Sequence, residues 1–386
     1  MSALRFGRFM LPRCNISYWP VIACDQYTSR PEYWMNEDKR VGDMPSSLRL
    51  ICPEAFLTEA DKRMADINAC SRDYAERVLK EYNGGVLVTR TGKRGSRCGI
   101  VCLADLECYD YSSCGSLIRA TEGTVTERIP PRLAVRESSV LDVSHVICLI
   151  DDPGKTVIEP LEGKGELLYD IQLSGGDRLE GRLISDKESV SDALDRLQEQ
   201  ASEEHRPFVL VGDGNHSLAA AKALYESYKR SGDERAASAR YALVEVENVR
   251  SDGVVFLPIH RIIYGMPGLA CRLESLGGDG HITLVRGDEC IEVRAPSEPA
   301  EAYASVQSII DESGAEVDYI HGDDEIRRIC GERTDALGIL MPPLDKSGLF
   351  DYIALHGVLP RKSFSMGEAE DKRYYMECRL IDGRSE

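Results

Sequence analysis

The residues best suited to chemistry form one short polar turn, residues 212–217, with the sequence Gly-Asp-Gly-Asn-His-Ser. An apolar run, residues 207–211, precedes it, and a helix-favouring run, residues 218–224, follows it. This order predicts a strand, a tight turn and a helix, a geometry in which backbone N–H groups and the helix dipole face an anion. The turn also gathers a carboxylate, an amide, an imidazole and a hydroxyl, so we expect a ligand-binding or catalytic site here.

Two residues of this 212–217 turn are catalytic candidates. Asp213 could act as general base or as a metal contact, and His216 could transfer a proton or bind phosphate. The other positions could bind an anion through backbone N–H groups or short side chains: Gly212, Gly214, Asn215 and Ser217. The alternative is a purely structural turn, because Gly, Asp and Asn are common turn residues and Asn and Ser are common helix caps.

Composition limits the possible partners. The chain has 386 residues, with 47 Lys and Arg against 65 Asp and Glu, and its net charge of -18 argues against non-specific binding to nucleic acid or anionic membranes. No apolar stretch is long enough to span a bilayer, and the first residues lack the apolar core of a signal peptide. A cytoplasmic protein with a small-molecule ligand is therefore expected, and the oligomeric state is left open.

The thirteen cysteines are scattered and include no C-x-x-C pair. Four of them lie between residues 98 and 114, but without the paired spacing of a zinc site. We expect most cysteines to be small buried hydrophobic residues of a reduced protein.

Hydrophobic patterns predict helices over residues 58–82 and 190–201 and a hairpin of residues 86–90 and 97–106. Further strands are expected at residues 145–150, 167–173, 207–211, 241–246, 336–341 and 372–382. This mixed order favours an α+β or mixed α/β fold, with a mixed sheet, flanking helices and a smaller inserted lobe. We expect a main domain, or domains, over residues 1–265 and 333–386, and the lobe over residues 266–332.

Cationic segments beside glycines or prolines supply further candidates for anion binding, since guanidinium groups bind phosphate and carboxylate. The alternatives are surface ion pairs in a solvated loop and, for a lone histidine, a structural role in which its hydrogen bonds are made within the protein. The expected ligand-binding residues in these segments are Arg119, Thr121, Arg128, Arg132, His260, Arg261, Arg361, Lys362 and Ser363.

Two adjacent carboxylates, Asp151 and Asp152, follow a predicted buried strand. They could hold Mg²⁺, which takes few protein carboxylates together with substrate oxygens. The Asp-Pro sequence is also a common turn start. The chain has no Walker motif, no G-x-G-x-x-G after a strand, no H-E-x-x-H and no G-x-S-x-G.

Several of these motifs together resemble the DUF 1015 family, a domain of unknown function. The resemblance covers nearly the whole chain and implies no settled activity. It rests on the 212–217 turn, Pro258 to Arg261, Leu359 to Gly367, Arg119 to Thr124, Arg128 to Arg132 and Leu149 to Pro153.

Many members of that family carry Asp-Gly-His-His-Arg at the turn, which is similar to the nucleotide-binding motif of the ParB/sulfiredoxin group. That group includes a free serine kinase and implies that the turn holds nucleotide phosphates. In this chain His216 and the glycines match, but Ser217 stands at the arginine position, so a phosphate-binding cation is missing. Arg361 or Lys362 could supply one from elsewhere.

The leading expectation is therefore an enzyme that binds a phosphorylated small molecule, most concretely ATP or ADP with Mg²⁺, and transfers a phosphoryl group to a small metabolite or amino acid. Two alternatives stay open. One is a non-catalytic, metabolite-binding regulatory protein. The other is a metal-dependent phosphate-ester hydrolase with Asp151, Asp152, Asp213 and His216 as ligands.

Overall fold

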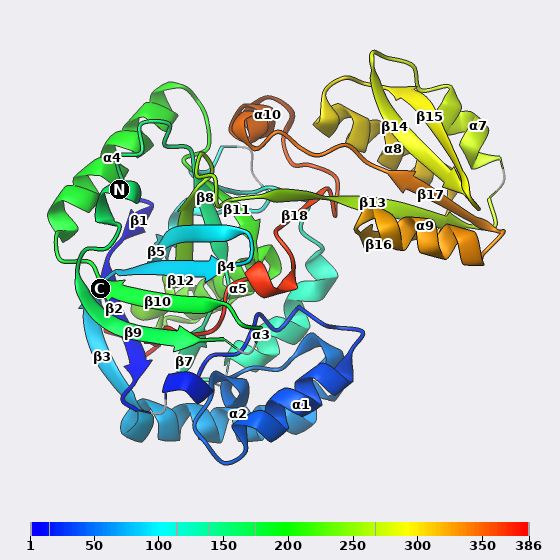
Figure 1. The fold of residues 1–386 in the computed structure, drawn as a ribbon. Helices are drawn as coiled ribbons and strands as arrows, with labels where there is room; N and C mark the ends of the chain where they lie inside the picture. Colours follow the sequence, from blue (N-terminus) through cyan, green and yellow to red (C-terminus); the bar gives the residue numbers. More distant parts are fainter. Residues whose placement is uncertain are drawn as a thin grey trace. The chain divides into compact units, whose positions relative to one another are not determined.

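The computed structural model describes residues 2–14, 16–112, 115–137, 139–173, 175–266 and 268–384. The chain forms two compact units, the first comprising residues 1–120, 124–254 and 369–386 and the second residues 121–123 and 255–368. Both units combine helices with β-sheet, so the expected mixed α/β class is confirmed (Figure 1). Cys114, one of the four clustered cysteines, lies outside the described residues.

A mixed nine-stranded sheet forms the centre of the first unit. Its order is β6-β11-β8-β12-β5-β4-β10-β9, and β1 pairs with β5. The β6–β11 and β8–β12 pairs are parallel and the others are antiparallel. The strands are β1 (Leu4–Arg5), β4 (Val86–Gly92), β5 (Gly95–Asp105), β6 (Ile118–Ala120), β8 (Ile147–Ile150), β9 (Glu166–Gln172), β10 (Arg178–Leu183), β11 (Val209–Asp213) and β12 (Tyr241–Asn248). The expected hairpin is β4–β5, which turns between Gly92 and Gly95.

A four-stranded sheet, in the order β3-β2-β19-β7, completes the first unit. Its strands are β2 (Gly7–Pro12), β3 (Leu79–Gly84), β7 (Leu141–Val143) and β19 (Cys378–Leu380). The expected helix over residues 58–82 is too long, because helix α2 (Ala60–Asp73) gives way to one π-helical turn and then to β3. Residues 79–84 form a strand because they pair with β2, and local propensity contains no information about that partner strand.

Helices of the first unit cover the large sheet through apolar faces. From α4 (Lys187–Glu203), Val190 and Leu194 join the same buried cluster as Val246 of the sheet. Leu218 and Leu224 of α5 (Asn215–Ser231) belong to that cluster too. The other helices of the unit are α1 (Pro31–Val41), α2, α3 (Ile129–Glu137) and α6 (Ala236–Ala239). Among the described residues, no helix has the length and apolar character needed to cross a membrane.

The second unit has a six-stranded sheet in the order β15-β14-β17-β13-β16, with β18 also paired to β13. Its elements are β13 (Phe256–Tyr264), α7 (Leu269–Glu274), β14 (Gly280–Arg286), β15 (Glu289–Ala295), α8 (Pro299–Ser313), β16 (Val317–His321), α9 (Asp323–Glu332), β17 (Ala336–Leu340), α10 (Leu349–His356) and β18 (Phe364–Met366). The expected lobe, residues 266–332, lies inside this unit. Its sheet is completed by β13 and β17, so residues on both sides of that range join it.

A buried ionic cluster ties the C-terminal segment, residues 372–379, to the large sheet. The guanidinium of Arg373 lies 2.9 Å from a carboxylate oxygen of Glu245 on β12 and 3.0 Å from one of Glu377. Arg90 on β4 also pairs with Glu245. All four side chains are almost completely buried. Buried charges of this kind are tolerated only when they are paired, so the cluster fixes where the C-terminal segment lies.

This cluster predicts a pH dependence of stability. Burial disfavours ionisation of Glu245, but Arg90 and Arg373 outweigh it and hold its pKa below the ordinary value of 4.5. Its carboxylate therefore stabilises the folded state above about pH 4.5, and this contribution is lost as the pH falls through the lower folded-state pKa. We expect Glu245→Gln to lower the free energy of unfolding at pH 7 by about 3–5 kcal/mol.

Urea unfolding at pH 7 and at pH 3 measures this effect, and the difference between wild type and variant should be smaller at pH 3. Glu166→Gln, at an exposed position of β9, is the control and should change little at either pH. Equal losses at both pH values for Glu245→Gln would contradict the assignment.

Candidate functional site

The 212–217 turn has the geometry expected from the sequence. Strand β11 ends at Asp213 and α5 begins at Asn215, while Gly214 between them has φ of 76°, in the left-handed region. A Cβ atom at this position would lie 3.0 Å from the Cα of Val146 and 3.2 Å from Cδ2 of His145. Glycine is therefore required at position 214 for two reasons, the left-handed backbone angle and the close approach to the segment before β8.

Side chains at the start of α5 hold the neighbouring loop. Asn215 donates to the hydroxyl of Thr124 at 2.6 Å and accepts from the hydroxyl of Tyr109 at 2.8 Å. Nε2 of His216 accepts from the backbone N–H of Val125 at 3.1 Å. In a neutral imidazole the proton then lies on Nδ1. The turn thus fixes residues 124–125, and both polar side chains have defined orientations.

Asp213 meets a cation from the C-terminal segment. Nζ of Lys372 lies 3.4 Å from Oδ2 of Asp213, and both side chains are largely buried. That oxygen accepts no hydrogen bond from the described residues. A buried carboxylate oxygen without a hydrogen bond, next to an ammonium group, can accept a further proton donor or a cation.

The three expected arginines of the first unit have different surroundings. Nε of Arg119 on β6 donates to the carbonyl of Ser116 at 2.9 Å. Arg128 is exposed just before α3. Arg132 on α3 pairs with Glu54, and its Nη1 donates to the carbonyl of Arg128 at 2.8 Å.

A cavity of about 70 Å³ lies beside the turn. Ser217 of the turn and Arg132 both line it, so the structure brings together two residues that the sequence placed in separate motifs. His145 and Tyr375 line it as well. The remaining wall includes apolar side chains, among them Leu50, Ile51, Leu57, Val135, Leu141 and Val143.

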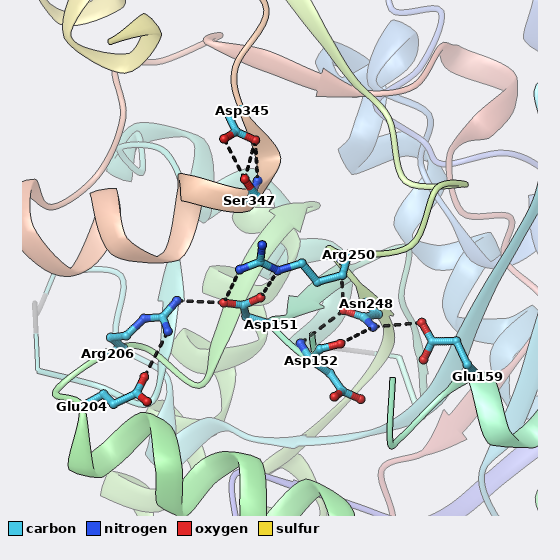
Figure 2. Close-up of polar contacts among 9 residues, drawn as sticks. All are labelled: Asp151, Asp152, Glu159, Glu204, Arg206, Asn248, Arg250, Asp345 and Ser347. Carbon is cyan, nitrogen blue, oxygen red and sulfur yellow. Dashed lines mark hydrogen bonds and ion pairs between the residues drawn. The ribbon is translucent and has the colours of Figure 1, made fainter. Parts of the chain in front are cut away.

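Asp151 and Asp152 lie at the other end of β11. Strands β8 and β11 are antiparallel, with Ile147 opposite Asp213, so the residues after β8 are far from the turn. The carboxylate of Asp151 pairs with two guanidinium groups, that of Arg206 at 2.8 Å and that of Arg250 at 2.5 Å (Figure 2).

The carboxylate of Asp152 instead accepts hydrogen bonds from the backbone N–H groups of Thr156 and Val157, at 2.6 and 2.9 Å. The described residues include no group of three or more His, Cys, Asp or Glu arranged to hold a metal ion. A metal role for Asp151 would require displacement of both guanidinium groups.

His260 and Arg261 lie on β13 of the second unit and are buried there. Nδ1 of His260 accepts from the backbone N–H of Met341 at 3.0 Å, and Nε2 lies 2.9 Å from Asp323. Burial lowers the pKa of His260, although Asp323 opposes this effect. The guanidinium of Arg261 lies over the ring of Tyr303. Both expected ligand residues thus have well-defined protein partners.

The segment with Arg361, Lys362 and Ser363 binds a carboxylate of the chain itself. Glu122 accepts from the backbone N–H groups of Lys362 at 2.8 Å and Ser363 at 3.0 Å. Burial raises the pKa of Glu122, and these two N–H groups partly offset the rise. Arg261 donates to the carbonyls of Lys362 and Arg361 on the same turn. The carbonyl of Thr121 accepts from the backbone N–H of Leu359.

Sequence reasoning missed the polar residues that the C-terminal segment brings to the first unit. The alternation of residues 372–382 predicts a strand, but within this range only β19 is a strand, and Lys372 and Tyr375 precede it. The available signal was the content of this stretch, in which two adjacent cations and two adjacent tyrosines precede apolar residues.

A family model described as "Protein of unknown function (DUF1015)" matches residues 6–281. The chain belongs to this DUF1015 family. A comparison with curated proteins finds no match.

Solved structures give matches of low similarity. A mutant of free serine kinase in complex with ADP has 12% identity and a TM-score of 0.38, over 68% of this chain and 86% of that chain. SbnI with a C-terminal truncation, from Staphylococcus aureus, has 12% identity and a TM-score of 0.38, over 72% and 82%. A conserved hypothetical protein from Pyrococcus furiosus has 10% identity and a TM-score of 0.34, over 72% and 90%. All three TM-scores are below 0.5, so we base the function on this chain's own geometry.

The packing of the turn makes a stability prediction. We expect Gly214→Ala to cost more than Gly232→Ala, although both glycines flank α5 with similar left-handed φ angles, 76° and 72°. Both substitutions cost about 1–2 kcal/mol for the backbone angle. Only Gly214 has neighbours that a Cβ would approach, whereas nothing lies within 4 Å of the Cβ position at Gly232. Urea unfolding of the two variants measures the difference, and equal costs would contradict the close approach.

Proposed function

We propose that this DUF1015 protein binds a phosphorylated small molecule, most concretely ATP or ADP with Mg²⁺, at the 212–217 turn and transfers a phosphoryl group to a small metabolite or amino acid. The observation that carries the proposal is the ion pair of Lys372 with Asp213 at the start of the 17-residue helix α5. A helix N-terminus and an ammonium group both favour phosphate.

Lys372 also bears on the resemblance to the ParB/sulfiredoxin nucleotide-binding motif. That motif has an arginine where this chain has Ser217. Lys372 is a cation beside the same turn, so it can replace the missing charge from a distant part of the sequence. We therefore include nucleotide binding of this type in the proposal.

The residues of the turn have complementary roles in the proposed reaction. Oδ2 of Asp213, which accepts no hydrogen bond from the described residues, fits a contact to Mg²⁺ as well as the alternative role of general base. His216, whose Nε2 accepts from the backbone N–H of Val125, is assigned to proton transfer or phosphate binding. Mg²⁺ would neutralise charge on the phosphates, and Arg132 near Ser217 would add to this stabilisation.

The remaining expected ligand residues stay predictions. Arg119 and Arg128 belong to the first unit, and Thr121, His260, Arg261, Arg361, Lys362 and Ser363 to the second. We also propose a cytoplasmic location, which fits the free thiols of the described cysteines.

Nucleotide binding tests this proposal. Isothermal titration of ATP and ADP with Mg²⁺ should detect binding to the wild type, and saturating nucleotide should raise the melting temperature, because a ligand at about 100 times its Kd adds ~2.7 kcal/mol of stability. We expect Lys372→Gln to weaken binding at least tenfold, since it removes a charge-assisted contact worth about 1.5–3 kcal/mol.

Two further variants and a control complete this test. Asp213→Ala and His216→Ala should abolish turnover while the protein stays folded, and Lys164→Gln, at an exposed position, should leave binding unchanged. Absence of nucleotide binding to the wild type would overturn the proposal. Tight binding without turnover of any acceptor would instead support a metabolite-binding regulatory protein.

A further inference from the structure

Arg136 on α3 lines the cavity of about 70 Å³ beside the 212–217 turn. Among the described residues, its guanidinium has one polar contact, 2.7 Å between Nη2 and Oδ1 of Asp142. That oxygen accepts no hydrogen bond from the described residues, so the N–H groups of Arg136 do not point at it. A guanidinium has five N–H donors, and those of Arg136 are therefore available to a ligand in the cavity.

The cavity wall carries more positive than negative side chains. Arg132, one helical turn before Arg136, lines the cavity too, but it pairs with Glu54 and donates to a backbone carbonyl. Glu54 is part of the wall, whereas Asp142, the partner of Arg136, is not. Apart from His145, the ionisable side chains of the wall that carry charge at neutral pH are thus two arginines and one glutamate. This excess of guanidinium groups favours an anionic ligand, and a carboxylate matches a guanidinium in shape and charge.

His145 supplies a second polar atom to the same wall. Its Nδ1 lies 2.7 Å from the hydroxyl of Tyr375, and both residues line the cavity. Its Nε2 forms no hydrogen bond with the described residues, and Oδ2 of Asp25, at 3.7 Å, is beyond hydrogen-bond distance. In a neutral imidazole each nitrogen is either a donor or an acceptor, so Nε2 can form a hydrogen bond with a polar ligand atom in either tautomer.

The volume and the remaining wall limit the size and character of the ligand. A water molecule needs about 10–15 Å³ of such volume, so a cavity of about 70 Å³ holds about five to seven atoms of that size. Apolar residues and two cysteines, Cys24 and Cys52, make up most of the wall outside the charged groups. Such a wall suits a short carbon chain.

We propose that this cavity is a binding site for a small carboxylic acid of about five to seven non-hydrogen atoms. The carboxylate pairs with the guanidinium of Arg136, the carbon chain lies against the apolar wall, and a hydroxyl or keto group contacts Nε2 of His145. An acid without an amino group is favoured, because an ammonium group would meet the excess of positive charge in the wall. The site does not depend on nucleotide binding at the 212–217 turn, in which Arg136 and His145 have no part.

Isothermal titration with matched small molecules tests the class of ligand. Butyrate and L-lactate should bind to the wild-type protein. Butyramide has the size of butyrate but no charge, so we expect it to bind at least tenfold more weakly. L-Alanine has the size of L-lactate, with an ammonium group in place of the hydroxyl, and should also bind at least tenfold more weakly. Octanoate is too large for the cavity and should not bind.

Two variants test the location of the site. Arg136→Gln should weaken butyrate binding at least tenfold, because it removes a charge-assisted contact. Arg230→Gln, at an exposed position of α5 outside the cavity wall, is the matched control and should leave binding unchanged. Since Arg136→Gln also takes the cation from the buried Asp142, Val135→Phe is a second variant, which keeps both ion pairs and fills the cavity. It should abolish binding while urea unfolding stays cooperative.

Histidine NMR tests the contact with His145 in the wild-type protein. In protein labelled with ¹⁵N-histidine, the ring signals of His145, assigned from their loss in His145→Gln, should shift when butyrate or L-lactate is added. The shift should be larger with L-lactate, whose hydroxyl can reach Nε2. The exposed His205 is an internal control, and its signals should not move.

The outcomes separate this site from the proposed function. No binding of butyrate or L-lactate to the wild type, or equal affinity for butyrate and butyramide, would overturn the carboxylate site and leave nucleotide binding standing. Binding that is unchanged in folded Arg136→Gln and Val135→Phe would also overturn it. Unmoved His145 signals during binding would overturn the contact with Nε2. Carboxylate binding by a protein that binds no nucleotide would overturn the proposed function and keep the cavity as a site.

Discussion

The first unit depends on the pairing of Arg373 inside the protein. Its guanidinium is held by Glu245 on the sheet and by Glu377 four residues along the chain. Because an unpaired charge in this position would be far too costly, the C-terminal segment has essentially one place to lie. The residues on either side of Arg373 are positioned as a consequence: Lys372 meets Asp213, and Tyr375 two residues on meets His145.

Close backbone approach is the second constraint. Gly214 allows β11 to turn into α5 directly against the residues before β8. Any side chain there would push the turn away from His145 and from the cavity that Ser217 lines. The same glycine therefore helps to position the proposed phosphate site on the turn. A rigid turn suits the proposed transfer reaction, because its rate depends on the alignment of the reacting groups.

In the second unit, ionisable side chains bind backbone groups of one turn. Glu122 receives the backbone N–H groups of Lys362 and Ser363, while Arg261 donates to carbonyls of the same turn. Both ionisable groups satisfy backbone atoms that would otherwise be left without partners in a partly buried loop. The segment whose cations resemble an anion site in the sequence thus already binds an anion, the Glu122 carboxylate, through backbone N–H groups.

The sequence predicts the strand, turn and helix around residues 212–217 and the β4–β5 hairpin, because both depend on glycines and short-range hydrophobic patterns. It also determined the family and the mixed α/β class. Residues 79–82 form a strand only because of their tertiary pairing with β2. Folding also brings Lys372 to Asp213 and Tyr375 to His145. These contacts join residues more than a hundred positions apart, and local patterns carry no information about such partners.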